Sequence, residues 1–401
     1  MRRITAVFLS VLLALSLAAC GNSNQNRVEN TPAGTEAAVT EADMSEQPSV
    51  SADDSGGDIP EAVEETGTDG PAPETEETET EPPAPWTWPV DTPENQGFRS
   101  EALPQIHEVY DSFPLLSAMI VKNGYVIDTY YKDGYDADSV FVLNSASKSV
   151  TNALFGIAVE LGYFDGTDDL LSDYLPQVAE QEDARWQEIT LWHLLTHTSG
   201  IATTDDALWG EWRGSENWMQ YIFALPMTSD PGTHFDYSTG NTHLLAAAIE
   251  AATGMTLYDF GQEYLFGPMQ MDSVRIDTDP QGNADGGNGI WMTTADMAKI
   301  GQLYLNNGVW EGEQLIPSEW IAQSTSSQFV PGGGRADYGY QWWVRTFGTA
   351  GHAAYFAQGH AGQYIIVVPD LSLVIAFNSD YEGATSIYWQ LVNSIVDACA
   401  G

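Results

Sequence analysis

Two β-hairpin signals lie near opposite ends of the apolar part of this 401-residue chain, and they constrain its fold most strongly. The first is Asn123-Gly124, a tight-turn dipeptide between two β-rich runs, and the second is Pro369-Asp370 in a similar setting. The expected strands are residues 116–121, 125–131, 364–368 and 373–377. Helix-like patterns fill residues 101–111, 149–161, 242–252, 294–306 and 385–400. This order predicts an α+β fold, with an antiparallel sheet flanked by helices and a helical insertion lobe.

The chain begins with a short apolar run that is typical of a secretory signal. Arg2 and Arg3 precede apolar residues 4–19, a run shorter than the ~20 residues that a bilayer span needs. The run ends in Leu17-Ala18-Ala19-Cys20, which resembles the bacterial lipobox. That resemblance implies removal of residues 1–19, lipid on Cys20 and an extracytoplasmic lipoprotein anchored to the bacterial cell membrane. An ordinary signal peptide cut nearby, or an uncleaved anchor, is the alternative.

Residues 20–85 form a separate acidic segment rich in Glu, Thr, Pro and Ser. Such a composition has too few large apolar side chains to offset the entropy of ordering, and its like charges repel and extend it. We expect a disordered linker between the lipid anchor and a folded domain that spans residues 86–401. The acidity could alternatively serve a partner, although a spacer is the simpler interpretation.

The charge balance excludes one class of partner. The chain has 57 acidic residues, 13 lysines and arginines, and a net charge of -44. A protein that follows nucleic-acid phosphates needs a basic stripe, so we expect no nucleic-acid partner. Adhesion to an anionic bilayer by charge alone is disfavoured for the same reason.

We expect neither a metal nor another cofactor. His193 and His197 are four residues apart, but the glutamate of a His-Glu-x-x-His zinc motif is missing. Residues 277–282 begin like a calcium loop, yet position twelve is Asn288, where a bidentate glutamate is expected. Besides Cys20 the chain has only Cys399, so it has no disulfide framework and no CxxC motif. Cys399 is interpreted as a packing residue or an exposed thiol.

A Ser-x-x-Lys pair opens one of the expected helices. Ser145 lies at the helix N-terminus and Lys148 follows three residues later, so both side chains share one face. A serine hydroxyl needs a base, and burial together with the positive helix N-terminus lowers the pKa of a lysine. The pair alone is common by chance, with a helix cap and a surface lysine as the simpler interpretation. The apolar stripe of Val150, Leu154 and Ile157 favours a buried, functional lysine.

Three further segments make a family resemblance specific. They are residues 189–200, residues 231–245 around Tyr237, and residues 359–363 with the sequence Gly-His-Ala-Gly-Gln. With Ser145 and Lys148, their order and spacing resemble the serine β-lactamase and penicillin-binding-protein superfamily. The nearest likeness is to its class C-like branch of esterases, D-aminopeptidases and 6-aminohexanoate-dimer hydrolases. This implies a β-lactamase/transpeptidase-like fold from about Trp86 to the C-terminus.

The resemblance also implies a role for each matching residue. Ser145 would attack a carbonyl carbon, while Lys148 and Tyr237 would act as general base and acid. Backbone N–H groups of Ser145 and Gln363 would form the oxyanion hole. Four further residues are expected to contact substrate: His360 beside Lys148 and Tyr237, Gly362 as a close-approach point, Asn241, and Trp343. Trp342 is a second candidate for the pocket wall.

Two departures from the family pattern bear on the substrate. Thr239 stands where β-lactamases typically have Asn, and His360 stands where they have Lys. Since both family residues hold a β-lactam, their absence favours a relaxed hydrolase of a small ester, amide or short peptide over an efficient β-lactamase. A Gly-x-Ser-x-Gly elbow is absent, which argues against an α/β-hydrolase. The alternatives are a D-amino-acid peptidase or carboxypeptidase on cell-wall peptides, and a non-catalytic module that binds peptidoglycan or a peptide.

Overall fold

The structure, a computed structural model, describes residues 84–333 and 335–399. The chain divides into two units, residues 1–79 and 80–401, and every described residue belongs to the second. The predicted signal peptide 1–19, the lipidation site at Cys20 and all but the end of the linker 20–85 lie outside the described residues. The described chain is packed from its start, since the Trp86 ring lies 4.8 Å from that of Trp310.

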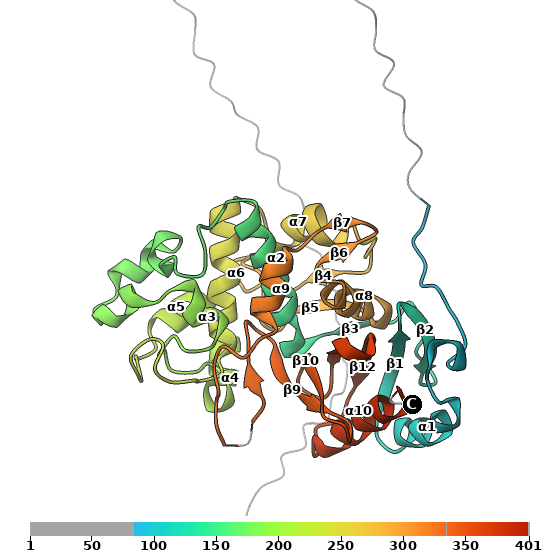
Figure 1. The fold of residues 1–401 in the computed structure, drawn as a ribbon. Helices are drawn as coiled ribbons and strands as arrows, with labels where there is room; N and C mark the ends of the chain where they lie inside the picture. The colour runs from blue at the N-terminus through green and yellow to red at the C-terminus, as the bar shows by residue number, and fades with distance from the viewer. Residues whose placement is uncertain (1–83, 334, 400–401) are drawn as a thin grey trace, which may run out of the picture. The chain divides into compact units, whose positions relative to one another are not determined.

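A seven-stranded antiparallel sheet in the order β2-β1-β12-β11-β10-β9-β8 forms the centre of this unit (Figure 1). Its strands are β1 (Leu115–Lys122), β2 (Tyr125–Tyr131), β8 (Asp337–Tyr338), β9 (Trp343–Phe347), β10 (His352–Gln358), β11 (Tyr364–Val368) and β12 (Leu373–Ser379). Both predicted hairpins are present, and β1 from one end of the chain pairs with β12 from the other. Asn123 (φ 54°) and Gly124 (φ 81°) both adopt the left-handed backbone that a two-residue hairpin turn requires.

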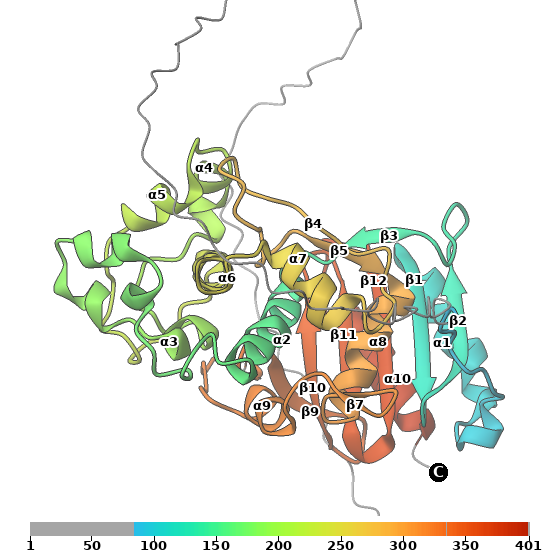
Figure 2. The same ribbon diagram turned by 90° about the horizontal axis from the view of Figure 1, so that it is seen from above.

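Helices cover both faces of the sheet, because its strands bury side chains on both sides (Figure 2). α1 (Leu103–Asp111) and α10 (Ser386–Cys399) pack on one face, where Ile120, Ile366 and Phe377 point. α8 (Thr294–Leu305) packs on the other face, against the alternating residues Val374 and Ile365. Cys399 is buried in the first of these cores, which identifies it as a packing residue.

The predicted helical insertion is present as a lobe of helices between β3 (Val140–Val142) and β5 (Ile290–Thr293) in the chain. Its elements are α3 (Leu191–Leu195), α4 (Trp209–Arg213), α5 (Trp218–Phe223), α6 (Thr239–Thr253) and α7 (Leu257–Gly261). The remaining elements are β4 (Arg275–Ile276), β6 (Val309–Trp310), β7 (Glu313–Gln314) and α9 (Ser318–Ser324). In Figure 1, α3 and α5 lie on the side of α6 that is remote from β1 and β2, and α4 lies below α6. Within the described ranges, no helix is both long and apolar enough to cross a bilayer.

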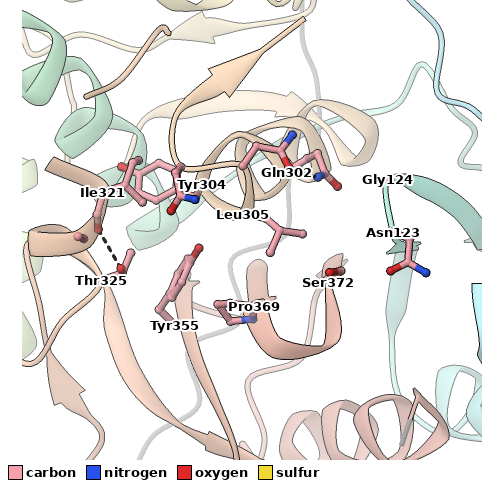
Figure 3. A pocket seen from close by; sticks show the side chains of 13 residues that line it. Asn123, Gly124, Gln302, Tyr304, Leu305, Ile321, Thr325, Tyr355, Pro369 and Ser372 are labelled. Atoms are coloured by element: carbon pink, nitrogen blue, oxygen red, sulfur yellow. Dashed lines mark hydrogen bonds between the residues drawn. The ribbon is translucent and has the colours of Figure 1, made fainter. Parts of the chain in front are cut away.

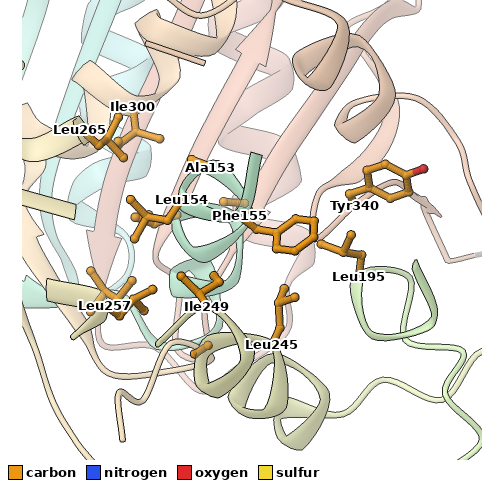
Figure 4. Packing of buried hydrophobic residues seen from close by; sticks show 14 of the residues in the cluster. Ala153, Leu154, Phe155, Leu195, Leu245, Ile249, Leu257, Leu265, Ile300 and Tyr340 are labelled. Carbon is orange, nitrogen blue, oxygen red and sulfur yellow. The ribbon is translucent and has the colours of Figure 1, made fainter. Parts of the chain in front are cut away.

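The helix that carries the Ser-x-x-Lys motif, α2 (Ser147–Glu160), is the centre of the larger core. Every residue from Ser147 to Ala158 is buried, so burial extends beyond the predicted apolar stripe to the whole circumference of the helix. Figure 4 shows the reason, because apolar residues of several elements surround Leu154 and Phe155. When a helix is buried on all sides, its polar residues are buried in the core as well. Lys148 is therefore 1% exposed.

Candidate active site

The candidate nucleophile lies in a short 3₁₀ turn, Asn144–Ala146, that runs directly into α2. Asn144 has φ 48°, a left-handed conformation that Asn tolerates better than most residues. Its side-chain amide donates to the carbonyl of His360 at 2.9 Å and to Gln363 Oε1 at 3.0 Å. The turn of Ser145 is thus tied to the turn between β10 and β11, 216 residues away. The local sign of this role in the sequence is Asn144, directly before Ser145, which was not among the predicted site residues.

Lys148 has three hydrogen-bond acceptors around its amine. Nζ donates to Ser145 Oγ at 3.1 Å, to Thr239 Oγ1 at 3.0 Å and to the Gly287 carbonyl at 2.9 Å. These acceptors come from the turn that precedes α2, the N-terminus of α6 and the loop before β5. Chain segments 139 residues apart therefore position one amine beside the candidate nucleophile.

The proton arrangement around this amine depends on Thr239. The Thr239 hydroxyl donates to Asp205 Oδ1 at 2.8 Å, so it accepts the hydrogen bond from Lys148. The Gly287 carbonyl can only accept. When Lys148 is neutral, its two N–H groups therefore bind these two partners, and its lone pair faces the Ser145 hydroxyl. Thr239 was noted in the sequence as a departure, whereas Asp205 lies in a loop that offered no signal.

Burial supplies the neutral form of this amine. It lowers the pKa of Lys148 from 10.5 to about 8, although the charges of Asp205 and Asp285 act in the opposite direction. A substantial fraction of Lys148 is therefore unprotonated near neutral to mildly alkaline pH. An amine with this pKa, within hydrogen-bonding distance of a serine hydroxyl, can act as a general base.

Tyr237 lies beside the same two groups. Lys148 Nζ is 4.9 Å from the centre of its ring. Burial raises the pKa of the Tyr237 phenol well above 10, and the adjacent Ser145 hydroxyl counteracts only part of this rise. The ring stacks on Trp343 with centroids 5.8 Å apart and planes at 17°. Tyr237 is therefore held as a neutral phenol, and Lys148 loses its proton first.

Neutral aromatic neighbours complete this side of the site. His197 is buried, its ring centroid is 4.5 Å from that of Tyr237, and its Nε2 lies 3.1 Å from Tyr338 Oη. Burial, followed by the nearby Lys148 charge, lowers the pKa of His197 well below 6.5.

The other histidine of the i,i+4 pair, His193, caps the start of α3, where its Nδ1 accepts a hydrogen bond from Thr190 N at 2.9 Å. No cluster of three possible metal ligands occurs among residues 84–333 and 335–399.

Three of the predicted substrate contacts lie elsewhere. The imidazole of His360 is exposed and its Nε2 lies 3.7 Å from Glu382 Oε1, whereas its backbone carbonyl accepts from Asn144. Asn241 is 2% exposed and accepts from Ser199 at 2.8 Å, so it supports the start of α6. Gly362 has φ 105°, and a Cβ there would lie 2.2 Å from Ser379 Oγ. Internal packing therefore explains this glycine without a substrate.

Of the remaining predicted residues, Trp343 lines the candidate site, whereas Gln363 and Trp342 are buried. Gln363 is 5% exposed, and its side chain donates to the Ser379 carbonyl at 3.0 Å. Trp342 is fully buried and packs 4.5 Å from Tyr304, so it belongs to the core. Trp343 alone of the two tryptophans lines the cavity beside Tyr237.

This cavity measures about 470 Å³ and has charged groups of both signs on its wall. Asp205, Asp206 and Asp236 lie among its lining residues, as do Arg335 and Arg345. Its aromatic lining comprises Tyr237, Trp343, Phe356 and Trp389. A larger hollow of about 760 Å³ between α8, α9 and β10 contains none of the predicted site residues (Figure 3). The smaller cavity is the candidate substrate site because Tyr237, the neighbour of Ser145 and Lys148, is one of its lining residues, although Ser145 and Lys148 themselves are not.

A buried lysine beside a serine at a helix start, with a tyrosine from a second lobe, defines a serine hydrolase of the β-lactamase type. A family model described as Beta-lactamase matches residues 106–390, and the chain belongs to this family. The match covers Ser145, Lys148, Tyr237 and the turn between β10 and β11.

Individual relatives are distant but span most of the folded region. The chain is 23% identical to the 6-aminohexanoate-dimer hydrolase of Paenarthrobacter ureafaciens, over 73% of this chain and 79% of the relative. It is 26% identical to penicillin-binding protein 4 of Amycolatopsis lactamdurans, over 66% and 78% of the two chains. A solved class C beta-lactamase has a TM-score of 0.60 at 15% identity, over 74% of this chain and 96% of that one. At this identity the structural likeness shows a common fold.

Proposed function

We propose that the protein hydrolyses a small ester or amide through an acyl-enzyme on Ser145. The observation that carries this proposal is the buried Lys148 amine, which lies within hydrogen-bonding distance of Ser145 Oγ while Thr239 Oγ1 and the Gly287 carbonyl can hold its two N–H groups when it is neutral. Such an amine accepts the hydroxyl proton without any rearrangement of the site.

The proposed reaction has two halves that use the same groups. Ser145 Oγ bonds to the carbonyl carbon as its proton moves to Lys148, and the carbonyl oxygen takes the negative charge. The N–H groups of Ser145 and Gln363 would stabilise that charge. The neutral phenol of Tyr237 would pass a proton to the leaving alcohol or amine, and Lys148 would return one to Tyr237. Water then attacks the acyl-enzyme by the reverse sequence, which releases the acid and restores Ser145.

The residues around Lys148 favour this activity over β-lactam hydrolysis. The Thr239 hydroxyl donates to Asp205 and accepts from Lys148. Its hydrogen-bonding capacity is therefore used within the protein and is not available to hold a substrate amide. The His360 imidazole, where β-lactamases have Lys, points to Glu382. A relative named for hydrolysis of a small organic dimer, the 6-aminohexanoate-dimer hydrolase, is consistent with an ester or amide substrate.

The proposal predicts where a covalent serine probe will react. A fluorophosphonate incubated with the full chain is expected to label Ser145, because Lys148 activates that hydroxyl. Peptide mass spectrometry locates the label, and Ser145→Ala should abolish it, whereas Ser394→Ala on α10 should not. Label on another serine would overturn the nucleophile assignment. A folded protein without any label would instead favour the non-catalytic binding module.

A second candidate activity, cleavage of D-amino-acid peptides that end in a free carboxylate, is favoured by Arg345. Its guanidinium carbon lies 4.8 Å from the Trp389 ring centre, and both residues line the cavity of Tyr237. Arg185 and Arg213 pair with Asp183 and Asp285, whereas Arg345 forms no salt bridge within the described ranges. An unpaired guanidinium can bind a substrate carboxylate with two hydrogen bonds.

Arg345→Gln separates this candidate from a neutral ester or amide. The full-length variant is expected to lose about tenfold in kcat/KM for N-acetyl-D-alanyl-D-alanine, the effect of one charge-assisted contact. Hydrolysis of its uncharged carboxamide should be unchanged, as should both rates in the control Arg275→Gln. Equal losses on the two substrates, or no cleavage of either peptide by the wild type, would exclude carboxylate recognition by Arg345.

A further inference from the structure

Asp205 holds the first residue of α6 through both oxygens of its carboxylate. Its Oδ2 accepts from Thr239 N at 2.6 Å, and its Oδ1 accepts from Thr239 Oγ1 at 2.8 Å. Ser238, the residue before the helix, forms no capping hydrogen bond with its own side chain. The free N–H groups and the dipole of a helix N-terminus favour a carboxylate there. The loop before α4 therefore supplies the group that fixes Thr239, from 34 residues earlier in the chain.

The two residues before Asp205 are fastened to the segment that carries Tyr237. The Thr203 hydroxyl donates to the Tyr237 carbonyl at 2.6 Å, and the Thr204 hydroxyl accepts from Gly240 N at 2.8 Å. Asp205 N donates in turn to Thr203 Oγ1 at 3.0 Å. The Asp205 carboxylate therefore has a fixed place beside the candidate active site.

This carboxylate decides which way the Thr239 hydroxyl turns. A hydroxyl has one proton, and here it is donated to Asp205 while the oxygen accepts from Lys148 Nζ. Without an acceptor at residue 205, the Thr239 proton would be free to turn toward the lone pair of the neutral Lys148 amine. It would then compete with the Ser145 hydroxyl for that lone pair. Asp205 thus keeps the amine available for the Ser145 proton.

Asp205 also places an uncompensated negative charge near the amine. Two carboxylates act on Lys148, those of Asp205 and Asp285. Asp285 is paired with Arg213, whereas Asp205 forms no salt bridge in the part of the chain that the structure describes. Negative charge favours the protonated form of a nearby amine. The charge of Asp205 therefore opposes burial, which is the larger influence on the pKa of Lys148.

The other titratable groups beside the amine are neutral. Burial is the main reason that the pKa of His197 lies well below 6.5, and burial also raises the pKa of the Tyr237 phenol. Neither group gains or loses a proton in the range where Lys148 titrates. A shift of the pH profile on removal of the charge at residue 205 is therefore a change at Lys148.

We propose that Asp205 is a positioning residue of the reaction, which points the Thr239 proton away from Lys148 and keeps a negative charge beside the amine. The inference rests on the proposed function, because it concerns the same amine and the same Ser145 hydroxyl. Asp205 transfers no proton itself, since the Ser145 proton still moves to Lys148. The two roles predict two separate effects, one on the maximal rate and one on its pH dependence.

Asp205→Asn is expected to change both quantities when the full chain hydrolyses p-nitrophenyl acetate. An amide offers one acceptor oxygen in place of two, so it cannot hold Thr239 N and Thr239 Oγ1 as the carboxylate does. The plateau of kcat/KM should fall about tenfold, the effect of one misplaced hydrogen bond at the base. Because loss of the negative charge lowers the pKa of Lys148, the acid-side rise should move about one pH unit lower.

Asp259→Asn is the matched control. The Asp259 carboxylate also accepts from a threonine hydroxyl, that of Thr256 at 2.8 Å, at the start of α7. It lines neither cavity, so the plateau and the pH of the rise should both match the wild type. Equal shifts in Asp259→Asn and Asp205→Asn would overturn the specific role of Asp205.

A double-mutant cycle with Thr239→Val tests the direction of the hydroxyl. In the valine background no hydroxyl can turn toward Lys148, so adding Asp205→Asn should change the plateau by less than about twofold. The acid-side rise should still move to lower pH, because the charge is lost in this background too. A further tenfold loss of the plateau would show that Asp205 does not act through Thr239, and would overturn the positioning role.

Ser145→Ala separates a failure of this inference from a failure of the proposed function. Hydrolysis that is equal in the wild type and Ser145→Ala would overturn both. Where hydrolysis depends on Ser145, a folded Asp205→Asn with the wild-type plateau and an unshifted rise would overturn the inference alone. Thermal unfolding of each variant checks that the rates belong to folded protein, which the similar shapes of aspartate and asparagine favour.

Discussion

Lys148→Met is expected to lower kcat/KM for p-nitrophenyl acetate by about 10³- to 10⁴-fold, the loss of a well-placed general base. Methionine fills most of the space of the buried lysine stem but cannot accept the Ser145 proton. It also leaves Thr239 Oγ1 and the Gly287 carbonyl without the Lys148 donor. The expected destabilisation from these two groups is partly offset, because a buried amine no longer has to be desolvated.

The wild-type pH profile is the companion measurement. Since burial lowers the pKa of Lys148 to about 8, most of the residue is protonated and inactive below that pH. The value of kcat/KM should therefore rise about tenfold per pH unit on the acid side and level off above about pH 8. The residual activity of Lys148→Met should lack this rise. A flat wild-type profile between about pH 6 and pH 9, or full activity in the variant, would exclude Lys148 as the base.

Tyr237→Phe is expected to lower kcat by about 10²- to 10³-fold, because it removes the proton donor to the leaving group. The phenylalanine ring can keep the stacking on Trp343, so thermal unfolding should change little. Burial raises the pKa of the Tyr237 phenol, which keeps it protonated over the working range. The variant should therefore retain the acid-side rise that belongs to Lys148.

The neighbouring phenol of Tyr338 provides the matched control. It is buried in the same aromatic group and lies 3.1 Å from His197 Nε2, but it lines neither cavity. Tyr338→Phe should retain most of the wild-type kcat. If Tyr237→Phe also retains most of the wild-type kcat, the phenol of Tyr237 has no chemical role and Lys148 acts alone.

The amino-acid order by itself determined the local parts of this protein. Asn123-Gly124 predicted the hairpin because its turn requires left-handed backbone at two successive residues, which Asn and Gly tolerate. The three-residue spacing of Ser145 and Lys148 placed both on one helix face because a helix repeats every 3.6 residues. The motifs also predicted the family and the α+β fold, since each motif lies within a few residues of chain.

Only the tertiary structure decided which groups surround the amine and which predicted contacts reach the site. Lys148 donates to Thr239 and Gly287, and Thr239 in turn donates to Asp205. These residues come from separate loops and helices, and no local sequence pattern connects them. His360 and Gly362 belong to the expected motif, yet side-chain direction and packing take them away from the cavity. Spacing along the chain fixes direction only within one helix or strand, whereas a site assembled across 139 residues depends on how the lobes pack.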